Sequence, residues 1–264
     1  MKERIFIPTR GRIGNQLTYD FLTKDVIEKY DVTLVCPKDE LRKHLMLGYN
    51  AISSPIEGIT KKRQIIMEYA QAMKIDRVMM IDDDLDKWAI RIDNNHWKLR
   101  PAKKKEVEFI IRNIFDLLDK YPLAGISERF GNNRLFPAIV KECTRQTQVH
   151  ALDVKKFFEI GARFDRLDLM EDFDVTLWFL THGYKNAKLV TCTADSFRQN
   201  KGGCKIYRTN ELQNKAARQL RNLYKDFVTL VTKKSKSGWE GMATRTDVRV
   251  QWAKAYESSK KNRK

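Results

Sequence analysis

Four carboxylates within five positions follow a short apolar run of the sequence. They are Asp82, Asp83, Asp84 and Asp86, and the run before them is Val78–Ile81. Like charges this close repel one another, and each resists leaving water. A divalent cation resolves that repulsion, because hard cations take oxygen ligands from one or two carboxylates and leave other positions for phosphates. The pattern therefore predicts a metal–diphosphate site at a strand end, with a solvated acidic turn as the alternative.

A second carboxylate pair, Glu171 and Asp172, opens a helix that we expect over 172–182, ended by Gly183. A general base needs a carboxylate within hydrogen-bond reach of the proton that it removes, often with a tuned pKa. Acidic residues also stabilise the start of any helix by capping it and by opposing its dipole. The pair is therefore a candidate catalytic site, with helix capping as the alternative.

Positive charge is concentrated at the end of the chain. The formal net charge is +17, and residues 201–264 hold 17 Lys and Arg against 5 Asp and Glu, a net of +12. Such an excess is the electrostatic footprint of a polyanion partner, since phosphate contacts dominate nucleic-acid affinity. A solubilising tail is the alternative. The candidate DNA-binding residues are Lys201, Lys205, Arg208, Arg218, Arg221, Lys225 and the glycine-flanked Trp239, whose ring could stack on a base.

The elements that must position these residues alternate between strand and helix in the first half of the chain. We expect strands at 4–8, 32–36 and 77–81, and helices at 16–30 and 60–73. This order predicts a parallel sheet with helices on both faces. Ligands bind beyond the carboxyl ends of such strands, which places 9–12 and 82–86 at one edge.

Later in the chain, apolar spacing predicts helices at 104–120 and 210–231. Arg218, Arg221 and Lys225 share one face of the second of these helices.

The composition fits one sizeable domain, or one domain with an elaborated end. The chain has 264 residues, of which 42% are hydrophobic, enough to build a core. No stretch approaches the roughly 20 apolar residues that span a bilayer, and the start lacks a signal-peptide pattern. We therefore expect a soluble, cytoplasmic protein. The four widely spaced cysteines suggest buried small residues rather than a zinc site or a disulfide framework.

The ordered motifs resemble the glycosyltransferases of the GT-A fold, especially the family-two-like enzymes. The matching segments are Ile-Pro-Thr-Arg-Gly-Arg at 7–12, the helix start at 58–64, Asp-Asp-Asp at 82–84 and Leu-Met-Glu-Asp-Phe-Asp at 169–174. The resemblance covers about 4–203. Two departures are visible: Lys62-Arg63-Gln64 stands where the family has Ala-Arg-Asn, and no late histidine completes a metal site, because His182 lies at a helix end.

The resemblance implies an α/β GT-A catalytic domain over 1–203, with a basic, mainly helical extension over 204–264. It implies a nucleotide-sugar donor, expected to be a UDP-sugar, and Mn²⁺ or Mg²⁺. Asp84 and Asp82 would hold the metal, with Asp86 as an alternative ligand. Asp172, beside Glu171, would be the base of an inverting reaction. The expected donor-binding residues are Pro8, Thr9, Arg10, Arg12, Arg63, Asp82 and Asp83.

The stretch 196–209 and the basic helix after it resemble more narrowly the phage TET-associated glycosyltransferases. Those proteins are proposed to attach sugars to hydroxymethylated cytosine in phage DNA. The resemblance implies modified DNA as the acceptor, a hexosyl or N-acetylhexosaminyl group as the cargo, and the host cytoplasm as the location. The alternatives are a polysaccharide or protein acceptor, or a non-catalytic nucleic-acid-binding protein. The sequence leaves the oligomeric state open.

Overall fold

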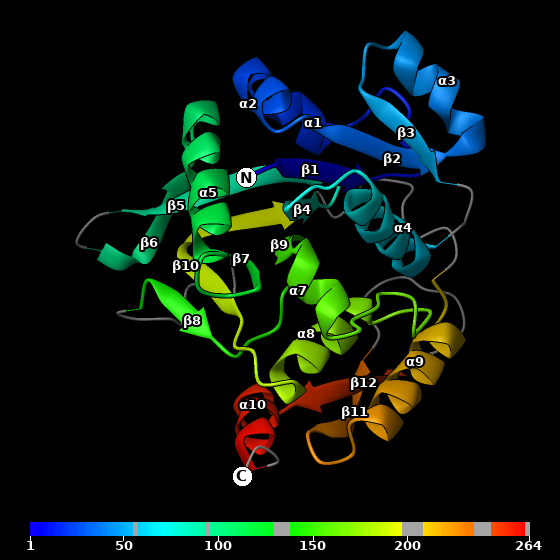
Figure 1. Ribbon diagram of the computed structural model, residues 1–264, viewed down its shortest axis with the longest axis vertical. Helices are drawn as coiled ribbons and strands as arrows, with labels where there is room; N and C mark the ends of the chain where they lie inside the picture. The colour runs from blue at the N-terminus through cyan, green and yellow to red at the C-terminus, as the bar shows by residue number, and fades with distance from the viewer. Residues whose placement is uncertain (55–57, 93–94, 129–137, 197–207, 235–243, 262–264) are drawn as a thin grey trace.

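The computed structural model describes residues 1–264 except 55–57, 93–94, 129–137, 197–207, 235–243 and 262–264. Its main feature is a ten-stranded sheet with the order β3-β2-β1-β4-β9-β7-β10-β5-β6, in which β8 also pairs with β10 (Figure 1). The strands are β1 (Glu3–Pro8), β2 (Thr33–Pro37), β3 (Ala51–Ser54), β4 (Arg77–Ile81), β5 (Leu85–Ile92), β6 (Asn95–Pro101), β7 (Leu123–Ser127), β8 (Val140–Glu142), β9 (Val149–Asp153) and β10 (Ala187–Ser196).

The sheet is mixed but mainly parallel. Strands β3, β2, β1 and β4 run parallel to one another. Strand β9 runs against both β4 and β7, so that β7, and β10 beside it, point the same way as β1. Strands β5 and β8 run antiparallel to β10, and β6 runs antiparallel to β5. Of these ten strands, β5, β8 and β9 therefore run opposite to the other seven. The predicted α/β architecture is confirmed.

Helices cover both faces of the sheet. Helices α1 (Leu17–Phe21), α2 (Lys24–Lys29) and α5 (Lys104–Leu117) pack on one face, and α4 (Ile59–Ala72), α7 (Val154–Glu159) and α8 (Glu171–Thr181) on the other. Helix α3 (Lys38–Met46) lies beside β2 and β3. All of β4 is consequently buried, which explains its unbroken apolar sequence.

The helix expected over 16–30 is interrupted. Helix α1 ends at Phe21, and Thr23 then caps α2 by accepting a hydrogen bond from the Val26 amide at 3.4 Å. A threonine side chain at such a position offers the backbone an alternative to continued helix. The break turns the chain, after the loop at 9–16 and α1, towards β2.

The C-terminal segment is less helical than expected. Helix α9 (Asn210–Leu223) stops well before 231, and the antiparallel strands β11 (Val228–Lys234) and β12 (Thr244–Val250) follow it before α10 (Trp252–Lys261). The predicted helix 210–231 is therefore wrong beyond Leu223. The β-branched run Val-Thr-Leu-Val-Thr at 228–232 favours a strand.

The C-terminal elements share a core with α8, which Figure 1 shows beside them. Leu177 and Leu180 of α8 cluster with Ala216, Leu220 and Tyr224. The hydroxyl of Tyr224 donates to Asp174 Oδ1 at 2.7 Å, and Asp174 is fully buried. The α8 helix is thus held from the sheet side and from the C-terminal side.

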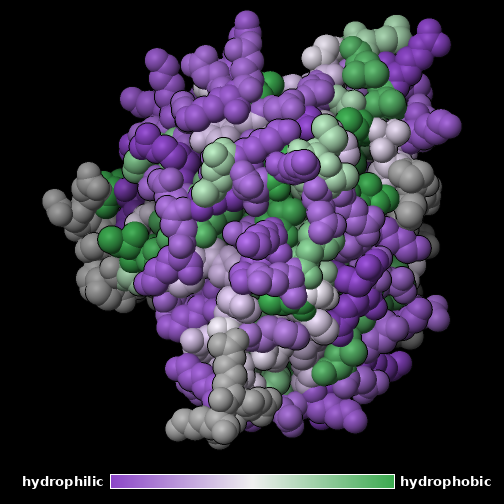
Figure 2. Space-filling view, in the orientation of Figure 1, coloured by the Kyte–Doolittle hydropathy of each residue, from purple (hydrophilic) through white to green (hydrophobic). Residues whose placement is uncertain are grey.

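The face of the molecule visible in Figure 2 is mostly hydrophilic, with only scattered apolar residues. Within the described ranges, no helix combines the length and hydrophobicity needed to cross a membrane.

Candidate functional site

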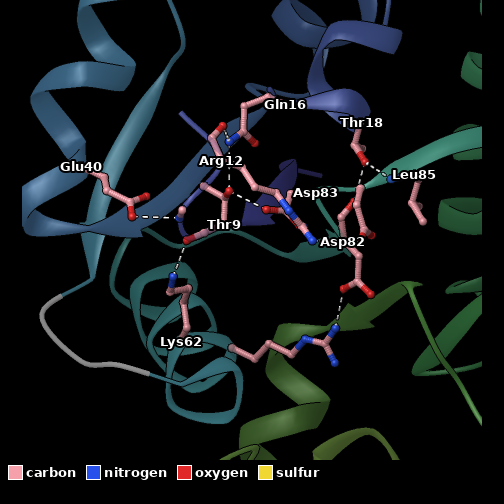
Figure 3. Close-up of polar contacts among 12 residues, drawn as sticks. Thr9, Arg12, Gln16, Thr18, Glu40, Lys62, Asp82, Asp83 and Leu85 are labelled. Atoms are coloured by element: carbon pink, nitrogen blue, oxygen red, sulfur yellow. Dashed lines mark hydrogen bonds and ion pairs between the residues drawn. The ribbon is translucent and has the colours of Figure 1, made fainter. Parts of the chain in front are cut away.

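Two loops meet at the carboxyl ends of β1 and β4, as the sequence predicts. The strands pair in parallel, so that Thr9 and Arg12 lie against the Asp82–Asp84 turn (Figure 3). The Thr9 hydroxyl donates to Asp83 Oδ2 at 2.5 Å, and Arg12 donates to Asp83 Oδ1. A second nitrogen of Arg12 lies 3.0 Å from Asp84 Oδ2. Both carboxylate oxygens of Asp83 thus accept hydrogen bonds from the protein, which fixes the turn to the β1 loop.

Three further residues hold the β1 loop. Lys62 Nζ donates to the Thr9 carbonyl at 2.6 Å, and Glu40 accepts from the Gly11 amide at 2.9 Å (Figure 3). Gln16 Nε2 donates to Thr9 Oγ1 at 3.0 Å and to the Arg12 carbonyl at 2.8 Å. No motif in the sequence points to a role for Lys62, Glu40 or Gln16. Lys62 lies on α4, Glu40 lies on α3 and Gln16 immediately precedes α1, and no local spacing marks them.

The turn is also held from α1. The Thr18 hydroxyl donates to the Asp82 carbonyl at 2.5 Å and accepts from the Leu85 amide at 2.9 Å. These bonds fix the backbone on both sides of the acidic residues. The carboxylates therefore project from a preorganised turn.

Arg63 of α4 connects this turn to α8. Its Nη2 lies 2.8 Å from Asp82 Oδ1, and its Nη1 lies 2.8 Å from Glu171 Oε1. Arg63 is only 4% exposed, so that both ion pairs lie largely out of water. A single buried guanidinium joins the two carboxylate motifs, which are separated by almost ninety residues of sequence.

Arg12 and Arg63 offset part of the repulsion among the carboxylates that the sequence predicts. Burial nevertheless raises the pKa of Asp82 to about 7, and Asp84, Asp83 and Glu171 add to the rise while Arg63 opposes it. Burial also raises the pKa of Asp83 to about 6, against the opposing effect of Arg12. The cluster therefore still favours a further positive charge.

The described residues fit a metal site that a substrate completes better than one in which the protein supplies every ligand. Among them, no three His, Cys, Asp or Glu side chains come together as metal ligands, so that Asp82, Asp84 and Asp86 do not form such a set. Asp86 lies on β5, and its buried Oδ1 has no hydrogen-bond partner in the described ranges. Two carboxylates suffice for Mg²⁺ or Mn²⁺ when a substrate diphosphate supplies the other ligands. Asp82 and Asp84 stand two positions apart in the turn, and they pair with Arg63 and Arg12 respectively.

The second motif begins α8 after Met170, a residue with φ 65°. Asp172 Oδ2 accepts from Arg145 Nε at 2.8 Å and lies 2.7 Å from Arg145 Nη2. Burial by itself raises the pKa of Asp172, but Arg145 and Arg63 outweigh burial and lower it below its ordinary value. Burial raises the pKa of Glu171 despite Arg63. The pKa values of these two neighbouring carboxyl groups are thus shifted in opposite directions, which is typical of carboxylates with different roles.

The other predicted residues lie in varied settings. Pro8 is buried in β1, and Arg10 is half-buried in the loop after it. Arg218 and Lys225 are exposed near the end of α9, with Arg221 half-buried between them. Arg208 lies close enough to Glu171 to lower its pKa. Lys201, Lys205 and Trp239 lie outside the described residues.

The strand order and the acidic turn at the β1–β4 edge define an α/β domain of the GT-A class. The chain belongs to the TET-associated glycosyltransferase family, whose sequence model matches residues 3–203. The match ends inside the segment before α9, so that the C-terminal elements lie beyond it. No curated protein matches the sequence.

The chain is similar to several solved structures at low identity. GalNAc-T7 with UDP, GalNAc and Mn²⁺ is 13% identical over 74% of this chain and 44% of its own, with a TM-score of 0.49. TarS 1–349 from S. aureus is 13% identical over 84% of this chain and 66% of its own, with a TM-score of 0.46. A cytidylyltransferase from Leptospira borgpetersenii is 10% identical over 61% and 63%, with a TM-score of 0.38. The chain spans less than two thirds of each.

Proposed function

We propose that the protein transfers a hexosyl or N-acetylhexosaminyl group from a nucleotide sugar, expected to be a UDP-sugar, to the hydroxyl of hydroxymethylated cytosine in DNA. The observation that carries the proposal is the link from Asp82 through Arg63 to Glu171, the residue before Asp172. It supports a reading in which the acidic turn and the candidate base serve one site, because the charge of Arg63 also acts on Asp172. Family membership supports the transfer of a sugar, and the basic C-terminal segment supports a polyanionic acceptor.

The β1 loop and the β4 turn would bind the donor. Thr9, Arg10 and Arg12 would lie over the nucleotide, and Asp82 would contact the ribose. Asp82 and Asp84 would hold Mn²⁺ or Mg²⁺, which when bound offsets the charge that develops on the leaving diphosphate. Arg12 and Arg63 would orient the same diphosphate, since guanidinium groups favour phosphates.

Asp172 would act as the general base. Its lowered pKa keeps it ionised at neutral pH, so that it can accept the proton of the acceptor hydroxyl. The hydroxyl oxygen then forms a bond to the anomeric carbon as the bond from that carbon to the diphosphate oxygen breaks, and the nucleoside diphosphate leaves with the electron pair. Such a single displacement inverts the configuration. The neighbouring Glu171 would hold Arg63 in place.

Mass spectrometry of nucleosides tests the activity directly. Hydroxymethylated DNA is incubated with a panel of nucleotide sugars and Mn²⁺, and we expect a hexose or N-acetylhexosamine mass on the modified cytosine. Asp172→Asn should lower the rate roughly 10²–10⁴-fold. Asp165→Asn, which changes the half-buried partner of the exposed Arg163, serves as the control. NMR of the product from an α-linked donor should show a β linkage, and an α linkage would refute inversion alone. Transfer to a polysaccharide or protein but not to DNA would refute the acceptor.

A charge-reversal variant tests the DNA-binding role of α9. The variant reverses the predicted residues Arg218, Arg221 and Lys225 to Glu. We expect weaker DNA binding with a flatter salt dependence, because fewer counterions are released. The matched control reverses three exposed residues of α3, Lys38, Arg42 and Lys43. Equal affinities and salt slopes in the two variants would show that the α9 face is only solvated.

A further inference from the structure

Two lysines on neighbouring strands face each other beside the candidate base. The antiparallel register of β8 and β10 sets Lys141 directly opposite Lys188. Side chains at such positions have Cβ atoms about 4.5–5.5 Å apart, and like charges there destabilise the pair. Within the described ranges, neither lysine makes a hydrogen bond or an ion pair. The described part of the fold therefore sets two ammonium groups opposite each other with no ion pair to either, and Glu128 and Asp172 act on Lys188 only at longer range.

Lys188 lies on the face of the sheet that carries Asp172. Its neighbours in β10, Ala187 and Leu189, join the core on the α5 face, so that the side chain of Lys188 is directed to the face covered by α8. Across β7 its partner is Gly125, which contributes no side chain. Lys188 is half-buried in this position.

Electrostatics link the lysine pair to Arg145 and Asp172. Burial lowers the pKa of Lys188 to about 8, with smaller contributions from the charges of Arg145 and Lys141 and against those of Glu128 and Asp172. Arg145 contacts only one oxygen of Asp172, keeps 41% of its side chain exposed and lies over the Phe173 ring at 4.0 Å. Lys141, Arg145 and Lys188 thus lie within electrostatic reach of one another.

We propose that Lys141, Arg145 and Lys188 form a binding site for a backbone phosphate of the nucleic-acid acceptor, next to Asp172. The inference rests on the proposed function, because the phosphate that it sets beside the two lysines belongs to the proposed DNA acceptor. The donor diphosphate has separate cationic partners in Arg12 and Arg63. A phosphodiester is favoured over other acceptor groups, since the chain carries a net charge of +17 and two ammonium groups suit a compact anion.

A phosphate held here would position the acceptor for proton transfer. The nucleotide that carries the reacting hydroxyl would be fixed through its own backbone, close to the carboxylate that removes the proton. Such positioning exchanges translational freedom for a defined geometry before the reaction. It also predicts a preference for an oligonucleotide over the free modified nucleoside.

The closing experiment measures binding without catalysis. The double variant Lys141→Gln/Lys188→Gln is compared with Lys24→Gln/Lys105→Gln, which removes two exposed lysines from the opposite face. Fluorescence anisotropy follows a single-stranded oligothymidylate of about 12 nucleotides over a range of salt concentrations. The first variant should bind roughly 10-fold more weakly at low salt, and its salt slope should fall by about 0.7–1.4. Equal affinity and slope in the two variants would overturn the proposal.

Two further measurements separate the possible outcomes. The melting temperature of Lys141→Gln/Lys188→Gln should equal or exceed that of the wild type, because a like-charge pair is removed; a large decrease would overturn the idea of an unmatched pair. In transfer assays the KM for a hydroxymethylated oligonucleotide should rise about 10-fold in this variant, with the donor KM unchanged. For the wild type, a neutral methylphosphonate linkage beside the target nucleotide should raise the KM for the oligonucleotide by a similar factor.

Transfer that ignores the methylphosphonate would overturn the phosphate site and leave the proposed function intact. Failure of transfer to every acceptor would overturn the proposed function, while the anisotropy comparison would still decide on the phosphate site. Competition by a polyol-phosphate polymer as strong as that by the oligonucleotide would overturn the assignment to nucleic acid.

Discussion

Removal of Arg145 should change the pH dependence of transfer. In the wild type, two nitrogens of Arg145 lie 2.7 and 2.8 Å from the same oxygen of Asp172. Burial alone raises the pKa of Asp172, and Arg145 and Arg63 together lower it below its ordinary range. In Arg145→Gln the effect of burial is opposed by Arg63 and by the hydrogen bond from the Phe173 amide. Loss of one close cation raises a carboxyl pKa by about 1–3.

The sign of the effect follows from the role of Asp172. A general base must be ionised, so that kcat/KM falls as the pH drops through its pKa. The acid limb of the wild type should lie below the usual range of an aspartate, and that of Arg145→Gln should lie about 1–3 higher in pH. The variant should therefore lose about 10- to 1000-fold in kcat/KM below both limbs. At alkaline pH the loss should shrink to the pH-independent part that follows from the proposed phosphate contact of Arg145.

The assay measures kcat/KM for a hydroxymethylated oligonucleotide from pH 4 to pH 9 with a radiolabelled donor. Arg163→Gln is the control, because it removes an exposed arginine whose partners are Asp165 and Glu68. Its profile should coincide with that of the wild type. If Arg145→Gln lowers activity by the same factor at every pH, Asp172 is not the group that titrates, and the reasoning about the base is refuted.

Three further variants test the metal site, the C-terminal contact and the packing of β7. Asp84→Ala should abolish transfer with the fold intact, because it would remove a metal ligand from a half-buried turn without opening the apolar core; normal transfer, or unchanged Mn²⁺ binding by electron paramagnetic resonance, would contradict the assignment. Tyr224→Phe should cost about 1.5–3 kcal/mol in urea unfolding, because its hydroxyl bonds a buried carboxylate at 2.7 Å. Tyr19→Phe should cost less than about 1 kcal/mol, since that hydroxyl has only a 3.5 Å contact, and equal losses would count against the argument. Gly125→Ala should lower the free energy of unfolding by about 1–3 kcal/mol or more, because the new Cβ would collide with a backbone carbonyl of β9. Its control Gly161→Ala has open space but φ 65°, and it should cost about 1–2 kcal/mol. A larger cost for Gly161→Ala than for Gly125→Ala would contradict the packing argument.

The sheet edge that carries the acidic turn could be predicted because its signals are local. Four apolar residues before Asp82 indicated a buried strand, and β4 is that strand. The rule for ligand sites in α/β sheets then placed the β1 loop beside the turn. Thr9 and Arg12 indeed contact it. A local pattern and a topological rule were sufficient for this part of the site.

The counter-charges could not be predicted in the same way. Arg12 pairs with carboxylates more than seventy positions away, and Arg63 reaches Glu171 across more than a hundred. Arg145 comes from a stretch with no clear periodicity. Side-chain pairs of this kind depend on how elements pack, which residue spacing does not encode.

The end of α9 was missed for a different reason. Apolar residues continue at a helical spacing past Leu223, so that the pattern alone extended the helix. Tyr224 instead turns to bond Asp174, and Val228 pairs with Val250 in a hairpin. Tertiary contacts outweighed a weak local preference.

The core that α8 shares with the C-terminal elements limits how modular this protein can be. A chain cut after residue 203, where the family match ends, would lose Ala216 and Leu220 and expose Leu177 and Leu180 to water. Each such leucine contributes about 1.5–3 kcal/mol when buried. The helix that begins with the candidate base therefore depends on the tail for its own packing. Exchange of tails between relatives, as a means to change acceptor preference, would require α8 to be exchanged with them.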